Sequence, residues 1–267
     1  MTDGSERVRV AVDGAVRTVT LCRPEKRNAL DAAMLAGLAA AFEGEPGPDE
    51  RVAVLRAEGP VFCAGLDLAE RRESWPERPS ERDARAPAGE SPIEDVLAAV
   101  DAWPLPVVAV VQGDAIAGGN ELALHCDLVV ASTRASFGMS LAQIGLAPTW
   151  YLAGKLLDVG GPVLARELLL LGEPVPATRL ADLGVIARAV PPHELEATAG
   201  RFVERLAANA PLSLRAIKAV IRRGIDARSG IAHDDVDALV DAAGHSADAR
   251  EGIAARLERR SPRFEGR

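Results

Sequence analysis

The chain has 267 residues and a formal net charge of −8 at pH 7, which disfavours binding to nucleic acid or to an anionic membrane. Its length suits one domain of moderate size, or a domain with a short helical extension. No stretch reaches the ~18 apolar residues that cross a bilayer, and the polar N-terminal residues contain no apolar signal segment. We therefore expect a cytoplasmic protein with no nucleic-acid or membrane partner, in which any anionic ligand is held locally.

The first third of the chain predicts a hairpin followed by a helix. Polar and apolar residues alternate over Val8–Leu21 around Asp13 and Gly14, which is a strong hairpin signal. A polar turn follows. Asp31 is then a good N-cap for a helix over Ala32–Phe42.

The polar turn before this helix carries three cations, Arg23, Lys26 and Arg27. Such side chains could meet the phosphates of a ligand. From the residues alone, a solvated basic loop is the preferred interpretation.

Two glycine-containing turns each follow a short apolar run that predicts a buried strand. The run Val52–Arg56 precedes a turn around Gly65, and the run Val107–Val111 precedes a turn that contains Gly118 and Gly119. Glycine lets the backbone approach a ligand closely, and a helix that begins after a turn leaves its first amide N–H groups unpaired. The two turns could therefore aim two N–H donors at one oxygen atom.

Glu121 lies in the first turn of the helix expected before the next apolar run, Leu128–Ala131. A glutamate there can simply complement the helix dipole. Because its neighbours are apolar, we expect the pKa of its carboxyl group to be raised, which would suit proton transfer. His125 is placed on the same helix face, where it either tunes this carboxyl group or packs as an ordinary buried histidine.

The middle of the chain changes composition sharply. Residues Ala69–Pro92 are rich in Arg, Glu, Pro and Ser and have no apolar period, which predicts a mobile excursion. Apolar residues at helical spacing predict a helix over Ile93–Trp103. Trp150 and Tyr151 are half-buried candidates, either for a pocket wall or for an aromatic pair in the core.

The last part of the chain predicts one extended segment, Val185–Val190, among helices. The expected helices are Leu152–Leu157, Pro162–Leu171, Glu194–Asn209, Ser213–Arg222, Asp234–Ala243 and Asp248–Arg260. The three cysteines are widely spaced, so we take them as reduced thiols, and the four histidines do not cluster, so we expect no metal site.

Five segments, in this order and spacing, resemble the crotonase (enoyl-CoA hydratase/isomerase) superfamily. They are RPEKRNALD at Arg23–Asp31, FCAGLDL at Phe62–Leu68, QGDAIAGGNELALHCD at Gln112–Asp127, SFGMSLAQIGL at Ser136–Leu146 and FVERLAANAPLSLRAIK at Phe202–Lys218. The resemblance implies an α/β (α+β) fold, a spiral of strand–strand–helix turns with two roughly perpendicular sheets. It also implies a core over residues 1–200 and a helical region over 201–267 that supports a homotrimer or a dimer of trimers.

The resemblance implies an acyl-CoA thioester as substrate, with coenzyme A as part of the substrate and no separate cofactor. The N–H groups of Leu66 and Gly118 would stabilise a thioester oxyanion, and Glu121 would transfer the proton. Leu141 and Trp150 would line the acyl pocket. The positions that match contacts to coenzyme A are Arg23, Lys26, Arg27, Ala29, Ala64, Asp67, Leu68, Lys218 and Phe264.

One position departs from the hydratases of this superfamily. They carry a second glutamate four residues after the position of Phe137, where this chain has Leu141. A single carboxylate suits an isomerase, which moves one proton between two carbons, although slow hydration remains open. The alternatives are a malonyl-type acyl-CoA decarboxylase and a crotonase-fold protein that binds acyl-CoA without catalysis.

Overall fold

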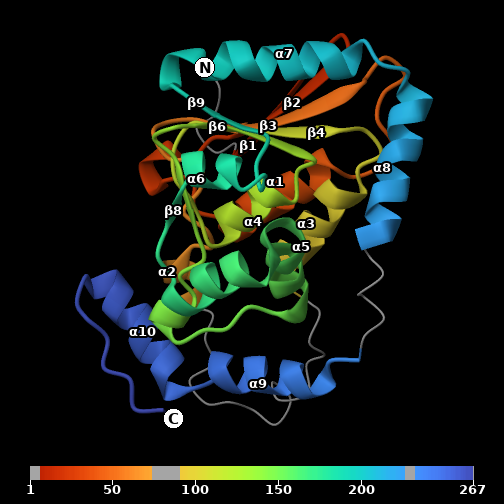
Figure 1. Ribbon diagram of the computed structural model, residues 1–267. Helices are drawn as coiled ribbons and strands as arrows, with labels where there is room; N and C mark the ends of the chain where they lie inside the picture. The colour runs from red at the N-terminus through yellow and green to blue at the C-terminus, as the bar shows by residue number, and fades with distance from the viewer. Residues whose placement is uncertain (1–6, 74–90, 226–231, 267) are drawn as a thin grey trace.

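The computed structural model describes residues 7–73, 91–225 and 232–266. Nine strands in these ranges form two sheets. The larger sheet has the order β1-β2-β3-β4-β6-β9, with bounds Val8–Asp13, Val16–Leu21, Val52–Ala57, Val107–Val111, Leu128–Ser132 and Arg188–Val190. The smaller sheet has the order β5-β7-β8, with bounds Ala115–Ile116, Ser136–Gly138 and Val175–Pro176. In Figure 1, β8 runs across the direction of β4.

The predicted hairpin is present as β1 and β2, which pair antiparallel, while β2, β3, β4, β6 and β9 pair parallel. The central strands β3, β4 and β6 are largely buried on both faces, which explains why they are continuous apolar runs rather than alternating ones. Ala53, Leu55 and Ala109 face the main core, whereas Val54 and Val110 belong to a second apolar cluster on the other face.

Helices cover the two faces of the large sheet. On one face lie α1 (Ala32–Ala41), α3 (Pro92–Ala102) and α4 (Gly118–Leu124), and on the other lies α7 (Leu195–Ala207) (Figure 1). Asp31 caps α1 as predicted, because its carboxylate accepts a hydrogen bond of 2.8 Å from the Met34 amide. Residue 200, the expected end of the core, falls inside α7, so that helix joins the sheet and the helical region.

The α-helices after β7 follow the sequence-based expectation except for a bend between two of them and one unpredicted short helix before β9. The helix α5 (Trp150–Arg166) contains a non-helical residue, Gly161, with φ of +67°, and continues into a π-helix over Glu167–Leu171. Pro162 follows Gly161, so the chain bends between the two predicted helices. A short helix, α6 (Ala177–Asp182), precedes β9.

The C-terminal helices are α8 (Pro211–Ile225), α9 (Asp234–Gly244) and α10 (Ala247–Glu258). The helix α10 packs on its own chain, where Ala249 and Ile253 form an apolar cluster with Ile144 and Leu146. A Cβ atom at Gly252 would lie 2.4 Å from the backbone carbonyl of Ile144, so the two backbones touch. Packing on a neighbouring copy, which the resemblance implies, is therefore not required for α10.

The mobile excursion predicted over Ala69–Pro92 is wrong at both ends. Residues Leu68–Glu73 form the helix α2, and Pro92 opens α3. The remainder, residues 74–90, lies outside the described residues. Within the described ranges, no helix is both long and apolar enough to cross a membrane.

Candidate active site

The two glycine turns predicted from the sequence lie in direct contact. A Cβ atom at Gly65, whose φ is +87°, would lie 2.9 Å from the Ile116 carbonyl oxygen and 3.1 Å from the Gly118 amide nitrogen. A Cβ atom at Gly119 would lie 2.2 Å from the Cys63 carbonyl oxygen. Only glycine permits these backbone approaches, so the turns after β3 and β4 form one structural unit.

Two backbone N–H groups at this contact, those of Leu66 and Gly118, are open, which means that they have no hydrogen-bond acceptor among the described residues. Leu30 pairs with the turn around Gly65, on both sides of Leu66. The Leu30 N–H donates to the Gly65 carbonyl (2.8 Å), and the Leu30 carbonyl accepts from the Asp67 N–H (3.0 Å). This parallel bridge directs the Leu66 N–H away from Leu30. Gly118 is the first residue of α4, and neither amide donates to an acceptor in the described part of the chain.

Glu121 lies one helical turn into α4 and its side chain is fully buried. The Asn120 side-chain amide donates to its Oε1 atom at 3.3 Å, whereas Oε2 has no hydrogen-bond partner among the described residues. Burial raises the pKa of Glu121 to about 8, with a further rise from the charge of Glu94, while the Asn120 hydrogen bond and the charge of Lys155 oppose it. The predicted direction is confirmed, and the carboxyl group is mostly protonated at neutral pH.

His125, one turn further along α4, is a packed histidine rather than a charged partner. Its Nδ1 atom lies 2.8 Å from the Glu121 carbonyl oxygen, which can only accept, so Nδ1–H donates. Its ring stacks on Tyr151 with a centroid separation of 5.2 Å. Burial lowers the pKa of His125 to about 3, so the contact of 3.7 Å between Nδ1 and Glu121 Oε2 is not an ion pair.

The helices α3 and α5 flank α4 and are joined to each other at two points. Thr149 Oγ1, at the start of α5, donates to Glu94 Oε1 at 2.7 Å. Further along the two helices, Lys155 Nζ donates to Asp101 Oδ1 at 3.2 Å. Glu94 was not among the predicted site residues. Its local sequence shows only an acidic residue in the first turn of a helix, where a negative charge complements the helix dipole.

The two aromatic residues are half-buried as predicted, and each stacks on a histidine. Trp150 stacks on His233, with ring planes 10° apart and centroids 5.2 Å apart, whereas Tyr151 stacks on His125. Leu141 is half-buried between the main core and the cluster beneath α10. An apolar side chain thus occupies the position that bears a glutamate in hydratases.

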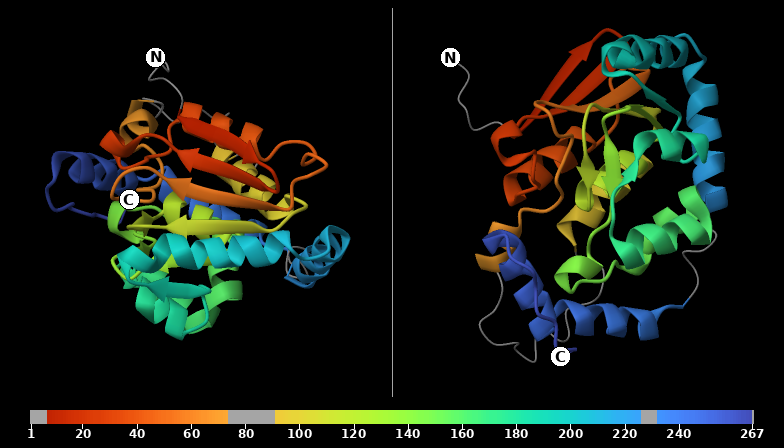
Figure 2. Two further views of the ribbon diagram at one scale, coloured as in Figure 1. Left: turned by 90° about the horizontal axis from the view of Figure 1, so that it is seen from above. Right: turned by 60° about the vertical axis from the view of Figure 1, so that its left-hand side comes forward.

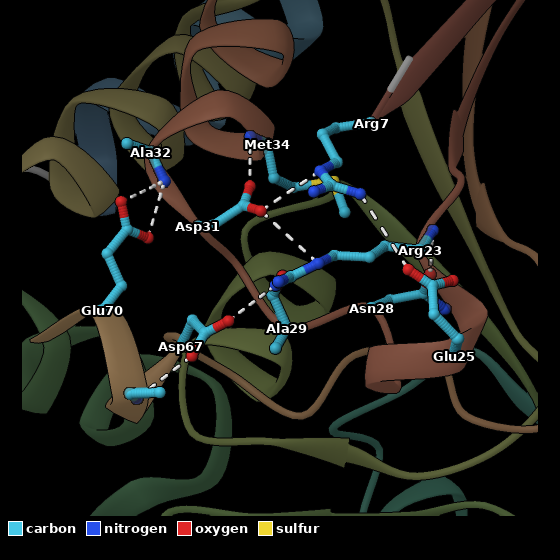
Figure 3. Close-up of polar contacts among 11 residues, drawn as sticks. Arg7, Arg23, Glu25, Asn28, Ala29, Asp31, Ala32, Met34, Asp67 and Glu70 are labelled. Carbon is cyan, nitrogen blue, oxygen red and sulfur yellow. Dashed lines mark hydrogen bonds and ion pairs between the residues drawn. The ribbon is translucent and has the colours of Figure 1, made fainter. Parts of the chain in front are cut away.

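Arg23 belongs to a polar network that joins two turns (Figure 3). We call the polar turn Arg23–Asp31 the first turn, and the turn around Gly65, which contains Asp67, the second turn. The Arg23 guanidinium lies 2.8 Å from Asp67 and 3.4 Å from Asp31, and also donates to the Ala29 carbonyl at 3.1 Å. Burial alone would raise the pKa of Asp67, but the hydrogen bond and charge of Arg23 lower it below its usual value. Arg23 is itself buried, so the exposed cations of this turn are Lys26 and Arg27.

Asn28 stabilises the same turn by hydrogen bonds, and it was not among the predicted site residues. Its Oδ1 accepts from the Arg23 amide at 2.8 Å, and its Nδ2 donates to the carbonyls of Glu58 (2.8 Å) and Val61 (2.9 Å). The backbone of Asn28 has φ of +52°, a conformation that asparagine adopts more readily than most residues. An asparagine in a polar turn was the available signal.

The remaining expected contacts to coenzyme A are spread over the chain. Ala64 joins the first turn, since its N–H donates to the Arg27 carbonyl at 3.0 Å. Leu68 opens α2. Lys218 lies beyond the C-terminal end of α4, where Nζ donates to Asp127 at 2.7 Å and to the Leu105 carbonyl at 3.2 Å. Phe264 is 45% exposed on the C-terminal tail.

Comparison with known proteins places this site in context. The family model described as enoyl-CoA hydratase/isomerase matches residues 11–267. A putative enoyl-CoA hydratase of Thermus thermophilus is 36% identical over 257 residues, which cover 94% of this chain and 98% of that protein. An enoyl-CoA isomerase/hydratase of Mycosarcoma maydis is 31% identical over 259 residues, which cover 93% and 92%.

Solved structures agree with these relatives. A methylmalonyl-CoA decarboxylase in complex with 2-nitronate-propionyl-CoA superposes with a TM-score of 0.86 at 26% identity, over 98% of this chain and 99% of that one. The predicted crotonase-type fold is therefore confirmed. By its fold and by sequence over nearly its whole length, the chain belongs to the enoyl-CoA hydratase/isomerase family of the crotonase superfamily.

Proposed function

We propose that this protein is an enzyme that transforms acyl-CoA thioesters of the enoyl-CoA type through a thioester enolate, with Glu121 as its proton-transferring group. The observation that carries the proposal is a buried glutamic acid whose Oε2 atom has no hydrogen-bond partner among the described residues, one helical turn from the open amide of Gly118, which lies beside the turn that carries the open amide of Leu66. A strongly perturbed pKa on a buried carboxyl group beside open donors is typical of catalytic sites.

The chemistry follows from the thioester. Negative charge develops on the thioester oxygen when the enolate forms, and the N–H groups of Leu66 and Gly118 are free to donate to it. Removing one such donor typically costs about 2.7–4 kcal/mol in the transition state. Glu121, protonated below a pKa of about 8, can deliver a proton to the enolate carbon and remove one in the reverse direction.

Within the family, water addition and double-bond migration are the reactions that the names of the curated relatives support. A second candidate is decarboxylation of a malonyl-type acyl-CoA, which the similarity to the methylmalonyl-CoA decarboxylase favours. That reaction needs an enolate stabilised by amide donors and one proton donor after carbon dioxide leaves. Leu141 and Trp150 are proposed to line the acyl pocket in either case.

Recognition of coenzyme A is proposed to use the first turn. Lys26 and Arg27 are its exposed cations, suited to phosphates, while Arg23 and Asp67 hold the shape of the turn. Backbone atoms of Ala29, Ala64 and Leu68 would contact the nucleotide. Lys218 and Phe264 are proposed to act, in a trimer or dimer of trimers, on the coenzyme A bound to a neighbouring copy.

The test is mass spectrometry of 2-enoyl, 3-enoyl, saturated and malonyl-type CoA thioesters after incubation in deuterated water. We expect a Glu121-dependent change: water addition, deuterium uptake with double-bond migration, or loss of carbon dioxide. The control is Glu121→Gln, in which the change should be nearly absent. Binding of thioesters without any change of mass would instead identify a non-catalytic acyl-CoA-binding protein.

A further inference from the structure

A second carboxyl group lies on α3, the helix whose start touches the start of α4. Glu94 lies in the first turn of α3, where its side chain is half-buried and accepts the hydrogen bond from Thr149. Its charge is close enough to Glu121 to contribute to the raised pKa of that residue. The proposed chemistry assigns no role to it.

The packing of three helices fixes where Glu94 lies. The side chain of its neighbour Ile93 lies against Gly118, since a Cβ atom at Gly118 would be 2.5 Å from Ile93 Cδ1. The start of α3 therefore touches the start of α4. The start of α5 packs along both helices, because Thr149 bonds Glu94 at the start of α3 and Tyr151 stacks on His125 at the C-terminal end of α4 (Figures 1 and 2).

Two links join α3 to α5, and each contains one residue whose charge acts on Glu121. Glu94 and Thr149 form one link, and Asp101 and Lys155 form the other, further along both helices. Glu121, on α4, is influenced by the negative charge of Glu94 and the positive charge of Lys155, so one member of each link acts on its carboxyl group.

The surroundings act differently on the pKa values of the two carboxyl groups. Burial raises the pKa of Glu94, and the charges of Asp95 and of Asp237 on α9 add to the rise, but the Thr149 hydrogen bond opposes it. Glu121 has only the weak 3.3 Å bond from Asn120 and the charge of Lys155 to oppose complete burial. A pair of carboxyl groups whose environments differ in this way can divide the roles of acid and base.

We infer that Glu94 is the second proton-transferring residue of the site and supplies from α3 the carboxylate that Leu141 leaves out. This inference rests on the proposed function and makes water addition to a 2-enoyl thioester its reaction. Glu94 takes a proton from water as the water oxygen bonds to Cβ, and the electron pair of the double bond moves toward the thioester oxygen. As the enolate collapses, Glu121 gives its proton to Cα, and the proton on Glu94 then restores Glu121.

A purely structural role for Glu94 makes a different prediction. Thr149 already caps α5 by accepting from the Leu152 amide at 3.4 Å, so the Thr149–Glu94 bond could serve only to join two helices. In that case, replacing Glu94 would lower thermal stability and move the pH profile through its charge effect on Glu121, but would leave the maximal rate of water addition unchanged. The inference requires that the maximal rate of water addition falls in the folded protein.

The experiment measures two reactions at pH 8 in Glu94→Gln and wild type. One is water addition to crotonyl-CoA, and the other is deuterium exchange at Cα of butyryl-CoA, which needs only Glu121 and the amide donors. We expect water addition to fall by about 10- to 1,000-fold in kcat. We expect exchange to stay within about threefold of wild type, because it uses neither water as nucleophile nor the Glu94 carboxylate.

The matched control is Asp95→Asn, which removes an equal charge from the exposed neighbouring position on α3 and should leave both reactions within about twofold. In Glu94→Gln, the limb of the pH profile that reports Glu121 should also move to lower pH, since a like charge has been removed. If Glu94→Gln fails to fold, Glu94→Asp, which retracts the carboxylate but keeps its charge, carries the same prediction for water addition.

Each outcome decides the matter. Loss of water addition with retained exchange supports the inference. Retention of both reactions, with or without a shift of the pH profile, overturns it and leaves the proposed function intact. Exchange without water addition in the wild type also overturns it, because no water is then activated. If the wild type shows neither reaction nor any other Glu121-dependent change, the proposed function falls and the role of Glu94 falls with it.

Discussion

Two polar regions beside the glycine turns differ in how well their charged groups are satisfied. In the first-turn network, Arg23 lies between Asp31 and Asp67 and the buried Asn28 makes three hydrogen bonds. Arg23 Nε makes no hydrogen bond but lies 3.4 Å from the opposite charge of Asp31, whereas on α4 Glu121 Oε2 and Asn120 Oδ1 have no hydrogen-bond partner among the described residues. Buried polar groups are normally paired, so the first region is built for stability and the second retains a group that stability alone would not favour.

The sharpest way to test this comparison is Glu121→Gln. The amide keeps the shape of the side chain but cannot donate or accept a proton in turnover, so we expect kcat to fall by about 10²- to 10⁴-fold. The rate is measured on whichever thioester the wild type transforms, with circular dichroism to establish that the variant is folded. Unchanged turnover would remove Glu121 from the mechanism.

The two amide donors provide the next test. In Gly118→Ala the added methyl group would fall 2.5 Å from Ile93 Cδ1, a side-chain tip that moves aside, and would crowd the space beside the open amide, so we expect a loss of about 10- to 100-fold in kcat. Leu66→Ala is the matched control, because only its backbone N–H is used, and it should stay within about fivefold. Equal losses in the two variants would contradict the assignment of backbone donors.

Glu121→Gln should also stabilise the protein in a pH-dependent way. The pKa of Glu121 is about 8 when folded and near 4.5 when unfolded, so its contribution to stability is complete below 4.5 and declines as the pH rises toward 8. The variant lacks this decline and should gain up to about 5 kcal/mol in the free energy of unfolding by pH 8. Urea denaturation at pH 5 and pH 8 measures it, and a gain independent of pH would argue against a raised pKa.

Asn28→Ala should lower the stability of the protein much more than its turnover. The substitution removes the donor to the half-buried Glu58 carbonyl and one of the two donors to the Val61 carbonyl, and it places alanine at φ of +52°, so we expect a loss of about 2–4 kcal/mol in the free energy of unfolding. Turnover per folded molecule should change little by comparison. A large loss of kcat at unchanged stability would show that the first turn acts in catalysis.

The smallest effects are expected at the exposed cations. Lys26→Ala and Arg27→Ala should each raise KM for CoA thioesters by about three- to tenfold and leave kcat unchanged. A simple acyl thioester that lacks the nucleotide end of coenzyme A provides the control, since its KM should not respond. An equal effect on both substrates would place the coenzyme A phosphates elsewhere.

Local patterns were sufficient to predict much of the fold. The hairpin around Gly14, the Asp31 cap and the helix over Ile93–Trp103 depend on neighbouring residues alone, and each is present. The prediction failed at Ala69–Glu73 because a short helix there gains its stability from packing against α10, which no local pattern records.

For the site, the sequence by itself determined which groups could do chemistry, and the tertiary structure decided how they are used. Glycines after strands and a glutamate among apolar residues predicted two turns and a raised pKa, because backbone freedom and desolvation are local properties. The engagement of Arg23 by Asp67, 44 residues away, and the effect of the Glu94 charge on Glu121 depend on how helices and turns pack. Long side chains choose partners by distance in space, and only the folded chain sets that distance.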